Sequence, residues 1–276
     1  MRTLLNTVAL EPNRWTQDRV PAFDLARDLL PAIRAAGFRR VEVWQYHVSR
    51  KTPDETKAVH EAADRLGLDF PVVGAYPQFH LEGPPEEASR AERFAVLDRA
   101  ALLGARWVKF FFGRVKGGEI TPRQLELTTA RVAEWVACGR AKNLSFCVEL
   151  HGGTIFDPYA YGRQYLAAHP DLGLRICYQP YGGQKTEDCL RTIRELGREI
   201  VHAHFSGENA SGRCRLADAA LDWRALVAAL KAANPEFLPS IEFVAGSFQP
   251  KERPFDLRPA LEDARADAQF LDSLLA

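Results

Sequence analysis

Short apolar runs alternate with longer amphipathic segments along the whole chain, and this alternation limits the fold more than any other feature. Eight runs of strand length occupy residues 3–9, 39–44, 68–76, 105–113, 145–151, 174–180, 199–207 and 239–245. Segments with helical spacing follow them at residues 18–36, 53–67, 84–104, 121–143, 157–169, 184–197, 218–233 and 256–275. Strands separated by helices pair in parallel, and eight such units predict a (β/α)8 barrel.

The length of 276 residues suits one barrel better than two smaller domains. No internal repeat, low-complexity stretch or linker interrupts the pattern. We therefore expect a single α/β domain, a (β/α)8 TIM barrel, over residues 1–276. Pro31 falls inside the first helical segment, so we expect a kink or a break there.

Charge, hydropathy and cysteine content argue against a nucleic acid partner, a membrane span and an oxidising compartment. Lys plus Arg and Asp plus Glu both number 36, so the formal net charge is zero, whereas nucleic acid binding normally needs a basic surface. No apolar run reaches the roughly 18 residues that a membrane span needs. The N-terminus does not resemble a signal peptide. The five cysteines are scattered and odd in number, which favours reduced thiols and a cytoplasmic protein.

The fifth predicted strand, Ser145-Phe-Cys-Val-Glu-Leu-His151, ends in a carboxylate and an imidazole. Successive strand residues face opposite sides, so Cys147, Glu149 and His151 share one face and the apolar residues share the other. An ionised glutamate facing a packed interior is costly unless a cation or polar groups pair with it. This strand therefore predicts a polar site at the barrel axis.

The same alternation, applied to every strand, directs further polar side chains towards the axis, most of them near the carboxyl ends of their strands. These inward residues are Glu42, Lys109, Glu149, His151, Gln179, His204 and Glu242. Several converging charges indicate a functional site. The non-functional alternative is a satisfied polar cluster in which Lys109 pairs with Glu42 or Glu149.

Two carboxylates, an imidazole and an amide oxygen suit one divalent cation, Mn²⁺, Mg²⁺, Co²⁺ or Zn²⁺. The predicted ligands are Glu149, Gln179, His204 and Glu242. Such an ion can polarise a sugar carbonyl and a neighbouring hydroxyl, and a carboxylate beside it can remove the proton from the carbon between them. We expect Glu42, Lys109 and His151 to contact the substrate. Alternatively, Lys109 only balances Glu42, and His151 is a polar residue at the barrel mouth.

Several segments together resemble a known family. They are GFRRVEVW (37–44), VELHGG (148–153), VHAHFSG (201–207), LDW (221–223) and SIEFVAG (240–246). In order and spacing the chain resembles, over nearly its whole length, the xylose isomerase-like barrel superfamily in its sugar phosphate isomerase and epimerase branch. The resemblance implies a metal held by Glu, Asp, His and Glu from strands five to eight. Glu149, His204 and Glu242 match three of these positions.

The resemblance also implies catalytic roles for Glu149 and Glu242, which would move a proton on opposite faces of the substrate. The chain departs from the family pattern in strand six, where Asp followed three residues later by His is usual. Here Gln179 and Gly182 stand in those places. Loss of one negative charge is expected to weaken metal binding and to alter the chemistry of the bound ion.

Four functions follow from these residues. The first is a sugar isomerase or epimerase acting on a small sugar, polyol or keto derivative. The second is a lyase (dehydratase) that removes the same proton from a keto-polyol and then loses water. The third is a metal-free, diverged sugar-binding barrel. The fourth, a phosphodiesterase on damaged DNA, is disfavoured by Gln179, Gly182 and the zero net charge. Relatives of this kind are often dimers or tetramers, so a homo-oligomer is possible.

Two predicted loops, 77–84 and 205–217, fall on the face where barrel enzymes keep their active sites. Glu208 and Arg213 in the second loop are either substrate contacts or solvated charges. Four aromatic residues near strand ends form either an apolar wall for a sugar or simple packing: Trp15, Trp44, Tyr76 and Phe79.

Overall fold

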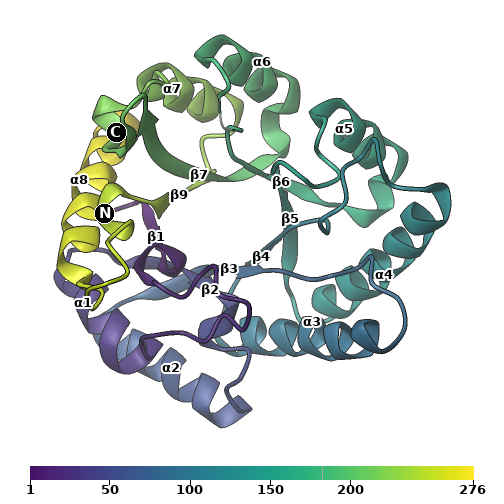
Figure 1. The fold of residues 1–276 in the computed structure, drawn as a ribbon, viewed down its shortest axis with the longest axis horizontal. Helices are drawn as coiled ribbons and strands as arrows, with labels where there is room; N and C mark the ends of the chain where they lie inside the picture. Colours follow the sequence, from purple (N-terminus) through teal and green to yellow (C-terminus); the bar gives the residue numbers. More distant parts are fainter. Residues whose placement is uncertain (182) are drawn as a thin grey trace.

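The computed structural model describes residues 1–181 and 183–276, and within them the predicted (β/α)8 barrel is confirmed. Parallel strands follow the order β6-β5-β4-β3-β2-β1-β9-β7, and pairing of β6 with β7 closes the ring (Figure 1). Their bounds are Leu4–Asn6 (β1), Arg40–Trp44 (β2), Asp69–Ala75 (β3), Trp107–Phe110 (β4), Ser145–Glu149 (β5), Arg175–Tyr178 (β6), Ile200–Asn209 (β7) and Leu238–Phe243 (β9).

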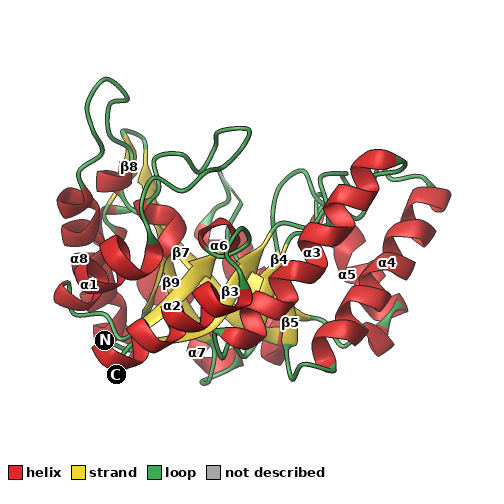
Figure 2. Cartoon of the chain, turned by 90° about the horizontal axis from the view of Figure 1, so that it is seen from below, coloured by secondary structure: helices red, strands yellow, loops and turns green. Residues whose placement is uncertain are grey.

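Helices surround the strands (Figures 1 and 2). They are Leu30–Ala35 (α1), Pro53–Leu66 (α2), Pro84–Leu102 (α3), Pro122–Arg140 (α4), Tyr159–Ala168 (α5), Thr186–Leu196 (α6), Trp223–Ala233 (α7) and Leu257–Leu275 (α8). Capping boxes at Thr52 and Thr121, each followed by proline, start α2 and α4. Among the residues described, no helix combines the length and apolarity needed to cross a bilayer.

The first strand and helix are shorter than predicted. The strand expected at 3–9 ends at Asn6, whose side chain accepts the N–H of Val8 and starts a 3-10 turn. The helix expected at 18–36 begins only after Asp24, which caps a π-helical turn, Leu25–Leu29 (η2), that continues into α1. The break predicted around Pro31 takes the form of this change of helix type.

Most of the loop predicted at 205–217 is instead a β-hairpin. Strand β7 continues to Asn209 and pairs antiparallel with Gly212–Cys214 (β8). Figure 2 shows β8 rising beyond the barrel strands. Gly207 permits this pairing, because a Cβ atom there would lie 2.2 Å from the carbonyl oxygen of Cys214.

The core between strands and helices is apolar, whereas charged side chains fill the centre of the barrel at its carboxyl end. The buried polar residues of this centre are Glu42, Lys109, Glu149, His202, His204 and Glu242, none more than 5% exposed. Their contacts with one another across different strands are possible only if they point towards the axis. These side chains therefore face the barrel axis, as the alternation along the strands predicted.

Candidate functional site

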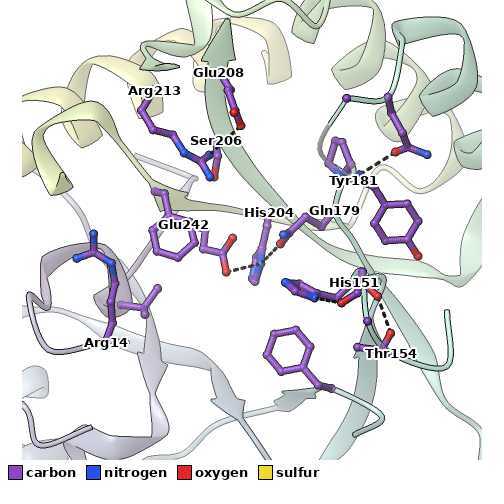
Figure 3. Close-up of a pocket in the computed structure, with 18 of the residues that line it drawn as sticks. Arg14, His151, Thr154, Gln179, Tyr181, His204, Ser206, Glu208, Arg213 and Glu242 are labelled. Atoms are coloured by element: carbon purple, nitrogen blue, oxygen red, sulfur yellow. Dashed lines mark hydrogen bonds and ion pairs between the residues drawn. The ribbon is translucent and has the colours of Figure 1, made fainter. Parts of the chain in front are cut away.

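A pocket of about 890 Å³ opens at the carboxyl ends of the strands. Figure 3 shows it with its polar side chains. Residues at or just beyond the strand ends line it, including Trp44, Tyr76, Phe111, His151, Gln179, His204, Ser206 and Glu242. A concave, partly apolar cavity with a few convergent polar groups at this face is where a barrel enzyme binds its substrate.

His204 lies at the centre of the pocket floor. Its Nδ1 is 3.0 Å from Oε1 of Gln179, 3.3 Å from Oε1 of Glu242 and 3.8 Å from Oε2 of Glu149. Its Nε2 lies 3.1 Å from both carboxylate oxygens of Glu42 beneath it. Strands β5, β6, β7 and β9 thus bring the four predicted metal ligands together.

The terminal amide of Gln179 contacts all three of the other predicted ligands. With its nitrogen facing the site, it donates to Oε1 of Glu149 at 3.0 Å and to Oε2 of Glu242 at 3.1 Å. The amide nitrogen donates hydrogen bonds to the carboxylates when no cation is bound, whereas the amide oxygen can bind a cation. Rotation of the amide by half a turn exchanges the two atoms. Gln179 can therefore serve this floor in either orientation.

Lys109 forms a buried ion pair with Glu149, with Nζ 2.6 Å from Oε2. Burial alone would lower the pKa of Lys109, but the Glu149 carboxylate outweighs it and the pKa lies well above its ordinary value. The ammonium also lies 4.7 Å from the centre of the Phe111 ring. Lys109 is fully buried beneath the floor, so it positions Glu149 from below and does not line the pocket.

Glu42 pairs with histidines rather than with Lys109. Its Oε2 lies 2.9 Å from Nε2 of His202, whose Nδ1 is 2.7 Å from the carbonyl oxygen of Leu238. Burial would raise the pKa of Glu42, but His204 and His202 hold it well below its usual range. Glu42 is fully buried and does not line the pocket either, so it orients His204 from below.

The buried side chains at the floor carry more negative than positive charge. The carboxylates of Glu42, Glu149 and Glu242 face one ammonium, that of Lys109, when the histidines are neutral. Two uncompensated charges in a buried site must be balanced by protons or by a cation. Burial would lower the pKa of His204, yet Cys177 and the carboxylates raise it well above normal. A divalent cation would supply the same balance.

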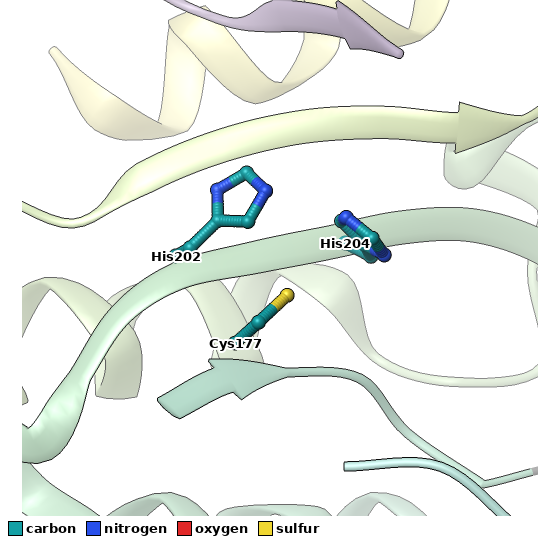
Figure 4. A group of neighbouring side chains, drawn as sticks. All are labelled: Cys177, His202 and His204. Atoms are coloured by element: carbon teal, nitrogen blue, oxygen red, sulfur yellow. The ribbon is translucent and has the colours of Figure 1, made fainter. Parts of the chain in front are cut away.

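Within residues 1–181 and 183–276, two groups of side chains place metal-binding atoms within 4.8 Å of one another. In the group Cys177, His202 and His204 (Figure 4), hydrogen bonds to Leu238 and Glu42 already engage both nitrogens of His202. Burial raises the pKa of the Cys177 thiol to about 12, which keeps it protonated. This group does not fit a metal ion.

The group Glu149, His204 and Glu242 does fit one. It offers two carboxylates and an imidazole, and the Gln179 oxygen can complete a set of four donors. His204, Gln179 and Glu242 line the pocket, whereas Glu149 is fully buried directly behind Gln179. The prediction that Gly182 replaces a family histidine falls outside the described residues.

His151 lies in the pocket wall and not in this group of donors. It follows β5, its Nδ1 is 2.7 Å from the carbonyl oxygen of Gly152, and its ring packs edge-on against Phe111. Trp15, Trp44 and Tyr76 also line the wall. Phe79 instead packs in the core, with its ring 5.5 Å from that of Trp135.

Three pocket arginines, Arg14, Arg19 and Arg114, were not among the residues expected from the sequence. They lie in the segments that follow β1 and β4. Their position just after a barrel strand could have indicated them in the sequence. Many solvent-exposed charged residues occupy similar positions, so this signal is not specific. Arg213, one of the two loop residues considered, also lines the pocket.

The family described as the xylose isomerase-like TIM barrel matches residues 30–274. No curated protein sequence matches the chain. Among solved structures, the fold is similar to D-psicose 3-epimerase with D-tagatose from Clostridium cellulolyticum H10 (TM-score 0.76, 15% identity, covering 100% of this chain and 99% of that one). It is also similar to a probable 3-DHS dehydratase from Bacillus anthracis (TM-score 0.73, 14% identity, 99% of both chains).

A third similar structure is a xylose isomerase-like TIM barrel protein from Mycobacterium smegmatis in complex with magnesium (TM-score 0.66, 14% identity, covering 99% of this chain and 97% of that one). At these identities the likeness establishes the fold, and the chemistry has to be argued from the residues of the site.

Proposed function

Because the chain belongs to the xylose isomerase-like TIM barrel family, we propose that it is an isomerase or epimerase of a small sugar, polyol or keto derivative that works with a divalent cation. The observation that carries the proposal is the placement of Glu149 and Glu242 around one point. Each carboxylate lies about 3 Å from the amide of Gln179, yet they come from β5 and β9, which β6 and β7 separate.

Two carboxylates that reach one point from different directions can act on the two faces of a substrate carbon. One removes the proton from the carbon beside a carbonyl, and the other returns a proton to the opposite face, which inverts the configuration. His204 lowers the pKa of Glu242 against the raising effect of burial, so Glu242 is ionised and able to accept a proton. Lys109 fixes the position of Glu149.

Glu149, Gln179, His204 and Glu242 would hold the cation. When bound, it would polarise the carbonyl and the neighbouring hydroxyl and so stabilise the charge that proton removal creates. The aromatic wall of Trp15, Trp44 and Tyr76 would exclude water from one side of the sugar.

The test is exchange of solvent deuterium into a panel of ketoses, followed by NMR with added Mn²⁺ or Mg²⁺. We expect deuterium at the carbon beside the carbonyl together with a new epimer. Glu149→Gln and Glu242→Gln should each slow exchange by at least about 100-fold. Glu236→Gln, which precedes β9 at the other end of the barrel, is the matched control. Full activity of Glu149→Gln would refute the proposal.

A lyase is the second candidate, because the same proton removal leads to loss of water if a hydroxyl leaves from the next carbon. His151 in the wall favours keeping this candidate, since an imidazole there can protonate a leaving hydroxyl. The same NMR experiment separates the two, because a lyase yields an unsaturated product whereas an epimerase yields an isomer.

A further inference from the structure

Arg14 is a buried cation that forms no direct ion pair among the described residues, and the Glu11 carboxylate acts on it only from a greater distance. It is 5% exposed, and its Nη atoms donate to the carbonyl oxygens of Glu11 at 2.6 Å and Ser247 at 2.7 Å. Its Nε is buried and has no hydrogen-bond partner in the part of the chain that the structure describes. Burial lowers the pKa of Arg14 to about 10, although the Glu11 carboxylate raises it, and Arg213 adds a smaller lowering effect. The guanidinium therefore keeps an unused donor, and the buried Glu11 carboxylate, whose own pKa is raised to about 7, balances its charge only in part.

Arg213 on β8 comes close to the same place. The guanidinium carbon of Arg14 lies 5.0 Å from the centre of the Phe248 ring, and that of Arg213 lies 5.4 Å from it. Both also lie within 5.7 Å of the Phe243 ring centre. Figure 3 shows the two arginines on one side of the pocket, beyond Glu242. Two like charges brought together at a pocket wall indicate that a negative group belongs between or beside them.

The other charges of the upper pocket have the same sign. Among the described residues that line it, Arg19 and Arg114 are also cationic, whereas the carboxylates are Glu242 on the floor and Glu208 on the rim. Glu208 is 60% exposed and lies 3.8 Å from Arg213, which makes it a weak partner. Arg19 donates to the Tyr46 hydroxyl instead of to an acid. The pocket therefore has a negative floor and a positive upper wall.

We propose that the substrate carries an anionic group, a carboxylate or a phosphate, and that Arg14 and Arg213 bind it. This inference rests on the proposed function, since it places the hydroxy-ketone end of the substrate at the floor. Phe243, whose ring both guanidinium groups contact, directly follows Glu242 in β9. The arginines therefore lie close enough to the floor for one small molecule to contact Glu242 at one end and the arginines at the other. The planar, forked guanidinium matches the oxygens of carboxylate and phosphate.

The test measures binding by calorimetry at low salt with two matched pairs of ligands. One pair is fructose and its terminal phosphate ester. The other is sorbose and the keto acid in which a carboxylate replaces its terminal CH₂OH group. We expect the anionic member of at least one pair to bind about tenfold tighter or more than its neutral partner. The pair with the larger preference identifies the anion, and added salt should reduce that preference.

The variants are Arg14→Gln and Arg213→Gln, and both should abolish the preference. Arg213 is one third exposed, so its change leaves the fold intact even if Arg14→Gln does not. Arg215→Gln is the matched control, because this residue lies two positions further along the same segment and pairs with Asp263 outside the pocket. It should retain the full preference.

Equal binding of both members, no binding of either anion, or an undiminished preference in Arg213→Gln would overturn the inference. These results are separate from turnover. An anion preference without deuterium exchange into any of these ketoses, neutral or anionic, would support the arginine site and refute the epimerase. Exchange on neutral ketoses without an anion preference would refute the inference alone.

Discussion

The ammonium of Lys109 lies 2.6 Å from Oε2 of Glu149, and neither side chain is exposed to solvent. Removal of one partner from a buried pair leaves the other charged and without compensation. We therefore expect Lys109→Met to lower the free energy of unfolding by about 3–5 kcal/mol in urea denaturation. The exposed pair between Lys142 and Asp98, at 2.8 Å, provides the control. Lys142→Met should cost less than about 1 kcal/mol, and equal losses in the two variants would contradict this account of the pair.

The Gln179 amide determines how many negative charges face the cation. Gln179→Asp adds one carboxylate to Glu149 and Glu242, so we expect Mn²⁺ to bind about tenfold tighter or more in calorimetric titration. Gln179→Leu removes the donor and should weaken binding. If neither the native protein nor Gln179→Asp binds Mn²⁺, the cation has no part in this site and the sugar-binding alternative gains support.

Asp267 gives the stability of the protein a pH dependence. It accepts the N–H of Leu216 at 2.9 Å, and burial raises its pKa from 3.8 to about 7. Between these pH values the folded protein holds a proton that the unfolded chain releases, so stability falls as pH rises and levels off above about 7. Asp267→Asn keeps the acceptor and loses the charge. Its gain over the native protein should be small at about pH 4 and reach about 4 kcal/mol above pH 7.

Thermal or urea unfolding across this pH range measures the effect. Asp18→Asn, at an exposed position, is the control and should leave the pH profile of the native protein unchanged. A constant difference between Asp267→Asn and the native protein at every pH would show that Asp267 does not titrate in this range.

Gly207 allows β7 and β8 to approach. A Cβ atom there would lie 2.2 Å from the Cys214 carbonyl oxygen, so Gly207→Ala should separate the hairpin and displace Arg213 from the pocket. We expect a loss of about 1–3 kcal/mol in stability, together with a weaker preference for anionic ligands. Gly118, where a Cβ atom would meet nothing within 4 Å, is the matched position. If Gly118→Ala has the same effects, the close approach at Gly207 is not their cause.

Much of the fold could be predicted because each strand and helix carries its own periodicity. The alternation in residues 145–151 places Glu149 on the inner face whatever the neighbouring strands do. The start of the first helix was harder to predict, because the polar and proline-containing segment before Asp24 has residues that also suit a helix surface. The hairpin at β8 was missed because its strand has only three residues, too few for a periodic signal.

Local sequence thus determined the barrel, the order of its elements and the inward direction of Glu42, Lys109, Glu149, His204 and Glu242. Tertiary structure alone decided the partners. Lys109 contacts Glu149 and Glu42 contacts His202 because of strand register and distance across the axis, which alternation along one strand does not encode. Arg14 and Arg213 lie about 200 residues apart in the sequence, and only closure of the barrel brings both to the same pocket wall beside Phe248.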